Sequence, residues 1–144
     1  MKILVLNGPN LGLLGTREPD VYGTETLERI IDRVRARAKE LDVALTAFQS
    51  DDEGALIAQI GSSAGQHDGM IFNPAGYTHT SVALRDALQA TPVPCVEVHL
   101  SNTLAREEFR HRSLTGGVCI GQIMGFGALG YVLALEALVD YLSR

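Results

Sequence analysis

The feature that most constrains the fold of this chain is a repeated change in the spacing of its apolar residues. Short apolar runs, typical of buried strands, alternate with longer stretches in which apolar residues recur at helical spacing. The predicted strands are residues 3–6, 43–48, 70–72, 95–100 and 118–120. The predicted helices begin near Thr24, run past residues 56–60, and cover residues 81–90 and 128–142. This alternation indicates a parallel sheet covered by helices.

A chain of 144 residues is long enough for one domain with its own core. We therefore expect a single catalytic domain over residues 1–144, of the α/β class: a flavodoxin-like three-layer sandwich with a five-stranded parallel sheet of order 2-1-3-4-5. In such open sheets, ligands bind beyond the carboxyl ends of the strands. The segments after strands one, three and four are therefore the places to look for a site.

Charge and composition exclude several classes of partner. Seventeen acidic and twelve basic residues give a formal charge of -5, so nucleic acid is not an expected partner. The basic residues between 29 and 39 share one predicted helix and are expected to form a solvated face. Cys95 and Cys119 match neither a metal-ligand pair nor a redox pair, and we expect buried, reduced thiols. With no signal peptide and no apolar run near the ~18 residues that span a bilayer, we expect a cytoplasmic protein without a membrane partner.

A long loop rich in glycine, residues 8–23, follows the first predicted strand. Loops of this length are usually functional or disordered. Asn10 could donate a hydrogen bond into a cleft, and Arg17 and Tyr22 could close over it as part of a lid. The alternative is a turn-rich connection in which the arginine and the tyrosine are incidental.

Polar residues also follow the third strand. Asn73 is placed to contact a carboxylate or a hydroxyl group, and His79 lies near the start of a predicted helix that carries Asp86. The alternative is that Thr80 or Ser81 only caps this helix, which would explain one hydroxyl and not the other polar groups.

The fourth strand ends with an ionisable pair. Because side chains alternate along a strand, Glu97 and His99 point to the same side. A neighbouring carboxylate orients an imidazole and favours its protonated form, as a general acid requires. The turn at Leu100 and Ser101 then exposes backbone N–H groups where an anion could bind. Arg106 and Arg110 follow and are expected on one face of a short helical turn, which suggests a substrate with a carboxylate or several hydroxyls.

Other chemistries find less support. Residues 125–130 match the dinucleotide fingerprint GxGxxG, but no further strand and no ribose-binding acid follow, so close packing of a helix on the sheet or an oligomer contact explains these glycines better. The four histidines show no metal-ligand spacing, and we expect no metal site. Neither lysine, Lys2 or Lys39, is placed to form an imine. The chemistry is therefore expected to be acid–base and electrostatic.

Several motifs together resemble the type II 3-dehydroquinate dehydratases, in the family's order and spacing and over nearly the whole chain. They are NGPNLGLLGTREP (7–19), YG (22–23), FQS (48–50), NPAGYTHTS (73–81), EVHLSN (97–102) and GFG (125–127). The resemblance implies a β-elimination of water from 3-dehydroquinate to 3-dehydroshikimate through an enolate, without metal or organic cofactor. It also implies a place in the shikimate pathway, towards chorismate and the aromatic amino acids, although quinate breakdown needs the same chemistry.

The resemblance assigns roles to residues at matching positions. Tyr22 matches the base, which must act as a phenolate, and Arg17 and Arg110 match the groups that supply the positive charge this needs. Arg17 also matches the residue of the lid that stabilises the transition state. Asn10 matches the group that holds a water against the enolate oxygen, and His99 matches the acid that protonates the departing hydroxyl.

The remaining matches concern orientation, substrate binding and assembly. Glu97 matches the residue that orients the acid. The positions that match substrate contacts are Asn73, His79, Asp86, Leu100, Ser101 and Arg110. Members of the family form homododecamers built as tetramers of trimers, and an aspartate at the position of Asp86 can serve a neighbouring subunit's site. Gly12, Asp51, Asp52 and Leu114 depart from the commonest pattern, and none of these positions carries a catalytic role in the family.

Two hypotheses from other classes remain on the residues alone. One is a non-catalytic flavodoxin-like binding or signalling module, such as a receiver or a flavin carrier. A receiver needs acidic residues at the end of the first strand, where this chain has Asn7 and Asn10, and a flavin carrier would be coloured. The other is a hydrolase that uses Ser101 and a histidine, which a serine-directed reagent would label.

Overall fold

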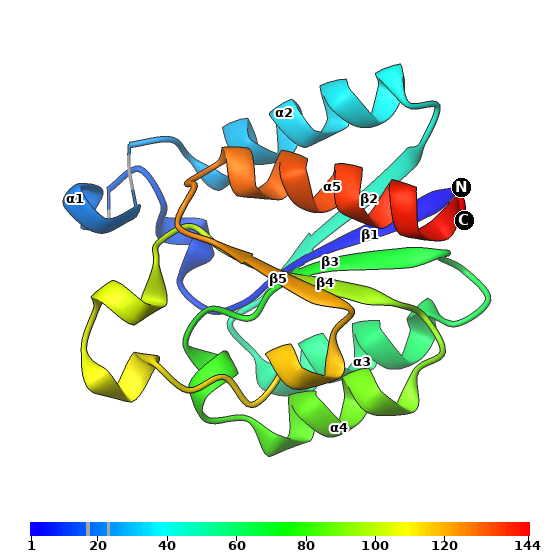
Figure 1. Cartoon of the computed structure of the whole chain (residues 1–144). Helices are drawn as coiled ribbons and strands as arrows, with labels where there is room; N and C mark the ends of the chain where they lie inside the picture. Colours follow the sequence, from blue (N-terminus) through cyan, green and yellow to red (C-terminus); the bar gives the residue numbers. More distant parts are fainter. Residues whose placement is uncertain (17, 23) are drawn as a thin grey trace.

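The structure, a computed structural model, describes residues 1–16, 18–22 and 24–144, and for Tyr22 the backbone alone. Its sheet has five parallel strands in the order β2-β1-β3-β4-β5, which confirms the predicted topology (Figure 1). The strands are β1 (Lys2–Asn7), β2 (Ala44–Gln49), β3 (Gly69–Asn73), β4 (Cys95–His99) and β5 (Gly121–Met124).

Helices cover both faces of the sheet, as expected for a three-layer sandwich. The pair α2 (Leu27–Glu40) and α5 (Leu129–Leu142) lies on one face, and the pair α3 (Glu53–Ser63) and α4 (Val82–Ala90) lies on the other (Figure 1). Each face has its own apolar core, because strand side chains alternate: Val5 and Ile71 pack under α2 and α5, whereas Leu6 and Phe72 pack under α3 and α4.

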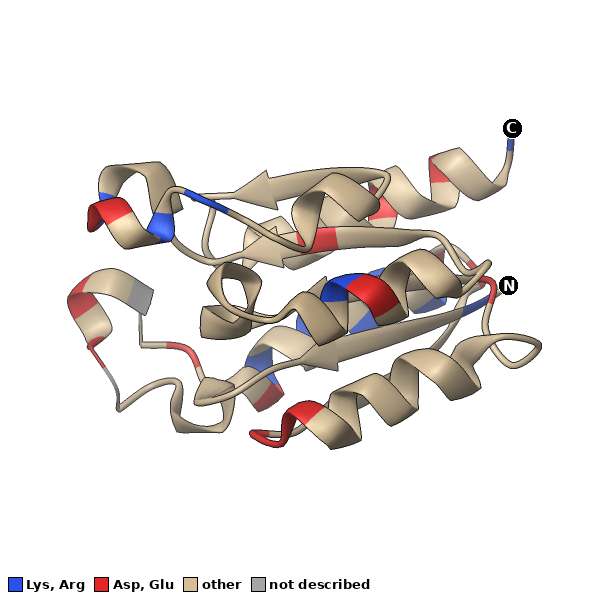
Figure 2. Ribbon diagram, turned by 90° about the horizontal axis from the view of Figure 1, so that it is seen from below, with Lys and Arg blue, Asp and Glu red and all other residues tan. Residues whose placement is uncertain are grey.

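Short helical segments occupy the loops at the carboxyl ends of the strands. They are η1 (Leu11–Leu13) and α1 (Pro19–Tyr22) after β1, η2 (Ala75–His79) after β3, and η3 (Thr103–Ala105) and η4 (Glu108–Arg110) after β4, whereas η5 (Gly116–Val118) leads into the amino end of β5. Figure 2 shows basic residues in the segment that carries η3 and η4. This end of the sheet is where the sequence predicted a ligand site.

The position predicted for the fifth strand was wrong by three residues. Residues 118–120 lie before β5, because the chain first makes the η5 turn, in which the N–H of Cys119 donates to the C=O of Gly116 at 3.2 Å. Pairing with β4 then runs from Gly121 opposite Val96 to Met124 opposite His99. Apolar content alone could not distinguish this turn from a strand. Cys119 is consequently only half-buried, whereas Cys95 is buried, and both are free.

Two helices that follow predicted site segments, α2 and α4, begin at hydroxyl caps. The cap of α2 is Thr26, whose Oγ1 accepts from the N–H of Arg29 at 3.2 Å, and not the predicted Thr24. The cap of α4 is Ser81, whose Oγ accepts from the N–H of Leu84 at 2.9 Å. Ser81 thus has the structural role that was the alternative explanation for one hydroxyl of its segment.

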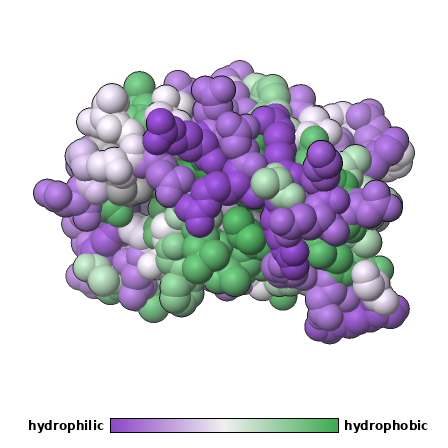
Figure 3. Space-filling view, turned by 90° about the horizontal axis from the view of Figure 1, so that it is seen from above, coloured by the Kyte–Doolittle hydropathy of each residue, from purple (hydrophilic) through white to green (hydrophobic). Residues whose placement is uncertain are grey.

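In segment 125–130, Gly130 allows the close packing of a helix on the sheet, one of the two explanations that the sequence offered. A Cβ at Gly130 would lie 3.3 Å from Cγ2 of Val98 and 3.7 Å from Cγ2 of Ile123, so its absence brings α5 close to the sheet. Gly125 has a φ of 95°, which favours glycine. Figure 3 shows an apolar area on the face above α5, where Leu129 and Leu133 are exposed.

In the described part of the chain, no helix has both the length and the apolar character that crossing a bilayer requires. Four of the five basic residues of α2 are exposed, Arg37 being half-buried against Glu136 of α5, and Arg33 and Arg35 form ion pairs with Glu25 and Asp32. This helix therefore presents the solvated face that its charge pattern predicted.

Candidate active site

A cavity of about 530 Å³ opens at the carboxyl ends of β1, β3 and β4. Its walls come from the loop after β1, from η2, from the turn after β4 and from η4. Among the residues predicted from the sequence, those that line it are Asn10, Asn73, His79, His99, Leu100, Ser101 and Arg110. The cavity lies where ligands bind in open α/β sheets.

Two predicted site residues do not line this cavity, and the side chains of two others lie outside the described structure. Glu97 lies behind His99 and is fully buried. Asp86 is exposed on α4 and outside the cavity wall. Arg17 lies outside the described residues, and so does the side chain of Tyr22, whose backbone ends α1.

The two ionisable side chains of β4 are in contact, which confirms that they share a face of the sheet. Nε2 of His99 lies 3.0 Å from Oε1 of Glu97. The ring of His99 is 7% exposed and reaches the cavity, whereas Glu97 is 0% exposed. A buried carboxylate needs compensation for the water it has lost, so its other partners decide its charge.

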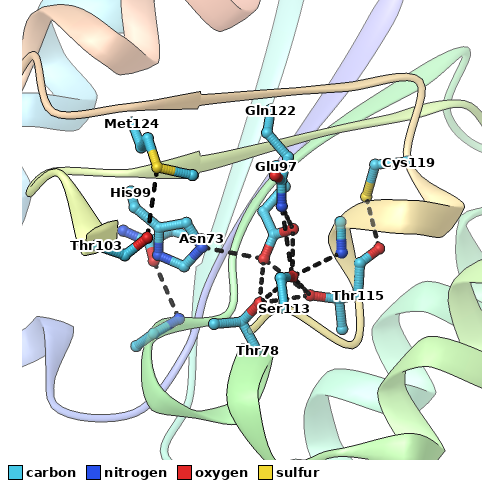
Figure 4. Close-up of polar contacts among 12 residues, drawn as sticks. Asn73, Thr78, Glu97, His99, Thr103, Ser113, Thr115, Cys119, Gln122 and Met124 are labelled. Carbon is cyan, nitrogen blue, oxygen red and sulfur yellow. Dashed lines mark hydrogen bonds and ion pairs between the residues drawn. The ribbon is translucent and has the colours of Figure 1, made fainter. Parts of the chain in front are cut away.

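Three side chains besides His99 donate to the Glu97 carboxylate and a fourth, that of Ser113, lies beside it; all four point towards it (Figure 4). Oγ1 of Thr78 and Oγ1 of Thr115 donate to Oε1, at 2.6 and 2.8 Å. Nε2 of Gln122 donates to Oε2 at 2.7 Å, and Oγ of Ser113 lies 3.3 Å from the same oxygen. We call these four side chains the Glu97 cradle.

The Glu97 cradle keeps the carboxyl group ionised. Burial alone would raise the pKa of Glu97, but the hydrogen bond and charge of His99, together with hydrogen bonds from Thr78 and Gln122, lower that pKa to about 2. An ionised Glu97 accepts a hydrogen bond from the Nε2–H of His99, which holds the ring in one orientation. The proton that His99 can exchange with a ligand is therefore the one on Nδ1.

The lowered pKa of Glu97 predicts a loss of stability in acid. A group with an ordinary value of 4.5 and a folded value of about 2 stabilises the folded state above pH 4.5 and loses this contribution as the pH falls towards 2. The contribution amounts to about 3 kcal/mol at neutral pH, of which about 2 kcal/mol is lost by pH 3. Between pH 6 and pH 3, the free energy of unfolding should therefore fall by about 2 kcal/mol less in Glu97→Gln than in the wild type. Urea unfolding at each pH measures both, and identical slopes would contradict the assignment.

Asn73 is held at the end of β3 by a partner on α5 and by the segment that follows it. Its Nδ2 donates to the hydroxyl of Tyr131 at 2.9 Å, and this hydroxyl donates to Oδ1 of Asn7 at 2.7 Å. Oδ1 of Asn73 accepts from the N–H of Ala75 at 3.0 Å. Burial raises the pKa of Tyr131, which keeps the phenol neutral. Tyr131 was missed because it lies in the apolar stretch of α5, where every sequence signal indicates core.

Asn10 is positioned by the segment after β2. It has a left-handed backbone with a φ of 68°, and its N–H donates to Oδ1 of Asp51 at 2.9 Å. The hydroxyl of Tyr77 donates to the C=O of Asp51 at 2.7 Å, so the same residue ties the loop after β1 to η2. Asp51 was noted in the sequence only as a departure from the family pattern. Its position in the loop gave no sign of this contact.

The basic side chains of the cavity are fixed by local partners. Nδ1 of His79 lies 2.7 Å from the C=O of Arg112, to which it donates, so Nε2 is the nitrogen left for a ligand. Nε of Arg110 donates to Oε2 of Glu107 at 2.6 Å. Nη1 of Arg106 donates to Oγ of Ser101 at 3.2 Å.

Arg106 and Arg110 do not share a helical turn, contrary to the prediction. Arg106 follows η3 and Arg110 ends η4, because the backbone at Arg106 and Glu107 is extended between the two turns. Both guanidinium groups nevertheless line the cavity. In residues 1–16, 18–22 and 24–144, no group of three or more His, Cys, Asp or Glu side chains is arranged to hold a metal ion.

Comparison with known proteins agrees with this site. Residues 1–139 match the model of the family described as dehydroquinase class II. The 3-dehydroquinate dehydratase of Desulforudis audaxviator (strain MP104C) is 55% identical over 144 residues, with 100% of this chain and 96% of the relative covered. That of Synechocystis sp. (strain ATCC 27184 / PCC 6803 / Kazusa) is 54% identical over 142 residues, with coverages of 99% and 93%.

Solved structures give the same answer. The type II dehydroquinase from Butyrivibrio crossotus DSM 2876 superposes with a TM-score of 0.95 at 45% identity, covering 96% of this chain and 97% of the other. The type II dehydroquinase from Propionibacterium acnes superposes with a TM-score of 0.91 at 41% identity, covering 99% and 97%. The chain therefore belongs to the class II dehydroquinase family, the type II 3-dehydroquinate dehydratases.

Proposed function

We propose that this chain removes water from 3-dehydroquinate to give 3-dehydroshikimate, as a hydro-lyase acting through an enolate. The observation that carries the proposal is the contact of His99 with the ionised, fully buried Glu97 at the wall of the cavity. In the reaction, a base takes the proton beside the ketone, and the electron pair moves into the enolate. The enolate then expels the hydroxyl group at the β position, which leaves as water with a proton from the acid.

Tyr22 is the proposed base, with Arg17 beside it. The proposal rests on the YG and NGPNLGLLGTREP motifs and on membership of the family. A phenol with a pKa of ~10 ionises at neutral pH only near positive charge. Arg110 lines the cavity and adds to that charge, which supports a phenolate in this part of the site.

Asn10 is the proposed residue that stabilises the enolate, by holding a water against the enolate oxygen. The left-handed backbone at Asn10 and the bond from its N–H to Asp51 fix the backbone from which the side chain extends before substrate binds. Such preorganisation lowers the barrier because the dipole needs no reorientation when the charge develops.

His99 is the proposed acid. With Nε2 donating to Glu97, the departing hydroxyl receives the proton of Nδ1. The negative charge of Glu97 lies 3.0 Å from Nε2, where it attracts the positive charge of an imidazolium ring. Glu97 therefore acts through His99 and orients it, as the sequence comparison implied.

The remaining predicted residues are proposed to bind the substrate's carboxylate and hydroxyl groups. Nε2 of His79, the second Nδ2 hydrogen of Asn73 and the guanidinium of Arg110 all belong to groups that line the cavity. The turn at Leu100 and Ser101 lies at the same wall and offers backbone N–H groups to an anion.

Asp86 is proposed to act in a neighbouring subunit's site, within a homododecamer built as a tetramer of trimers. Its exposed place on α4, away from this chain's own cavity, supports that role. The exposed apolar side chains of α5 give the chain surface suited to contact with other copies. We place the enzyme in the cytoplasm and in the shikimate pathway.

The function is tested by adding 3-dehydroquinate to the folded protein and following the ultraviolet absorbance of the conjugated product. We expect a steady rise in absorbance, without added metal or cofactor. Borohydride added with substrate should leave the activity intact, because neither Lys2 nor Lys39 lines the cavity and no imine forms. No rise in absorbance from folded protein at its native assembly would refute the proposed function, and inactivation by borohydride would refute the mechanism.

A further inference from the structure

The two oxygens of the Glu97 carboxylate are held in different ways. Oε1 accepts from Thr78, Thr115 and His99, all within 3.0 Å. Oε2 accepts from Nε2 of Gln122 at 2.7 Å, and its other neighbour in the cradle is Ser113 at 3.3 Å. Oε2 therefore has fewer contacts than Oε1 to keep the carboxylate from rotating about its own axis.

Ser113 has only one proton to give, and that proton has a nearer acceptor. Its Oγ lies 2.6 Å from Oγ1 of Thr78, whose own proton goes to Glu97. The same Oγ accepts from the N–H of Gly116 at 2.8 Å and from Nε2 of Gln122 at 3.3 Å. Counting donors in this way leaves Gln122 as the main donor to Oε2. Both amide hydrogens of Gln122 have acceptors, which fixes its nitrogen towards Glu97.

Gln122 reaches Glu97 through a space that glycine leaves open. A Cβ at Gly116 would collide with the Nε2 and Cδ atoms of Gln122 and would lie 2.8 Å from Oε2 of Glu97. Gly116 has no positive φ, so the need for glycine here is a need for space. Gln122 itself stands on β5 at the edge of the sheet and is exposed, so its amide also separates the buried carboxylate from solvent.

We propose that Gln122, in the space left by Gly116, is a positioning residue for the acid of this site. Its hydrogen bond holds Oε2 of Glu97, which turns Oε1 to Nε2 of His99 and keeps the ring aimed at the cavity. The inference rests on the proposed function, in which His99 protonates the leaving hydroxyl. According to this proposal, a residue of β5, a strand outside the predicted motifs, influences the step in which His99 gives its proton to the leaving hydroxyl.

The surroundings of Glu97 make the effect of this one donor measurable. The titratable or charged side chains that face this region are His99 and Cys95 beside Glu97, Cys119 beside Cys95, and His79, Arg110 and His111 in the hollow that Gln122 shares with His99. None of these is changed by a substitution at Gln122. The hydrogen bond from Gln122 is one of the causes that lower the pKa of Glu97. Its removal should therefore raise that pKa.

The test compares Gln122→Leu, Gly116→Ala, the double variant and the control Gly121→Ala. A Cβ at Gly121, next to Gln122 on β5, would meet nothing within 4 Å. We expect Gln122→Leu and Gly116→Ala each to lower kcat for 3-dehydroquinate about 10-fold with KM nearly unchanged, because a hydrogen bond to a charged group is lost. The double variant should be no slower than either, because both changes remove the same bond. Additive losses, or an equal loss in Gly121→Ala, would overturn the proposal.

A second measurement does not depend on turnover. In ¹³C NMR, the carboxyl carbon of Glu97, assigned with Glu97→Gln, should titrate about one pH unit higher in Gln122→Leu than in the wild type. Thermal unfolding identifies variants whose fold is damaged. An unchanged titration of Glu97 in a folded Gln122→Leu would refute the positioning role even if the enzyme is active. A different result would separate the two proposals. If Glu97 titrates at a higher pH in Gln122→Leu but the wild type has no dehydratase activity, the proposed function is refuted and the contact between Gln122 and Glu97 stands.

Discussion

His99→Ala should lower kcat for 3-dehydroquinate at least about a thousandfold, with KM changed little. The side chain supplies the proton that converts a poor leaving group, hydroxide, into water, and general acids of this kind contribute about 10²–10⁴ in rate. Among the described side chains that contact Glu97, none besides His99 has a ring that could act as this acid. The loss should be larger than for any change in the Glu97 cradle, because those residues act only through His99.

The matched control for this variant is His67→Ala. His67 is half-buried at the opposite end of the sheet from the cavity, where burial lowers its pKa, and it lines no part of the site. Steady-state kinetics on both variants, with thermal unfolding to show that each is folded, gives the comparison. Activity of His99→Ala within tenfold of the wild type would refute the role of His99 as acid.

Tyr22→Phe is expected to be as slow as His99→Ala, but at a different step. Phenylalanine has no ionisable group, so it cannot take the proton beside the ketone, and the enolate never forms. The two variants can be separated in D₂O. His99→Ala retains the base and should still exchange the substrate's acidic proton for deuterium, whereas Tyr22→Phe should exchange none.

Tyr141→Phe provides the control for this second variant. Tyr141 is 43% exposed on α5, and removal of its hydroxyl should leave both turnover and deuterium exchange as in the wild type. Mass spectrometry of recovered substrate measures the exchange, and absorbance measures turnover. Exchange at the wild-type rate in Tyr22→Phe would show that another group is the base.

The sheet could be predicted from the sequence because its strands are short apolar runs bounded by turn residues. Strands such as β1 and β3 are buried on both faces, so their sequences are nearly continuous apolar runs, which distinguish them from the polar segments around them. The fifth strand is the exception. It lies at the edge, it is partly exposed, and the apolar residues before it form the η5 turn, so the apolar signal was displaced from the strand itself.

The site was predictable to the extent that its residues lie at strand ends. Alternation along β4 placed Glu97 and His99 on one side, and the contact between them is present. The partners that hold these residues could not be predicted in the same way. Tyr131, Asp51 and Gln122 are distant in the chain from Asn73, Asn10 and Glu97, and only folding brings each of them to its partner.

The order of the strands also separates the two proton transfers. The proposed base and the enolate-binding Asn10 belong to the loop after β1, whereas the proposed acid and its cradle belong to β4, β5 and the segments around them, with β3 between. Apart from Arg110, which follows β4 and adds charge for the proposed base, each transfer thus has its own structural support. Substitutions along β5, the outer strand, can adjust the strength of the acid without moving the base. The limb of the pH profile that the acid sets can therefore change independently of the limb that the base sets, by selection or by design.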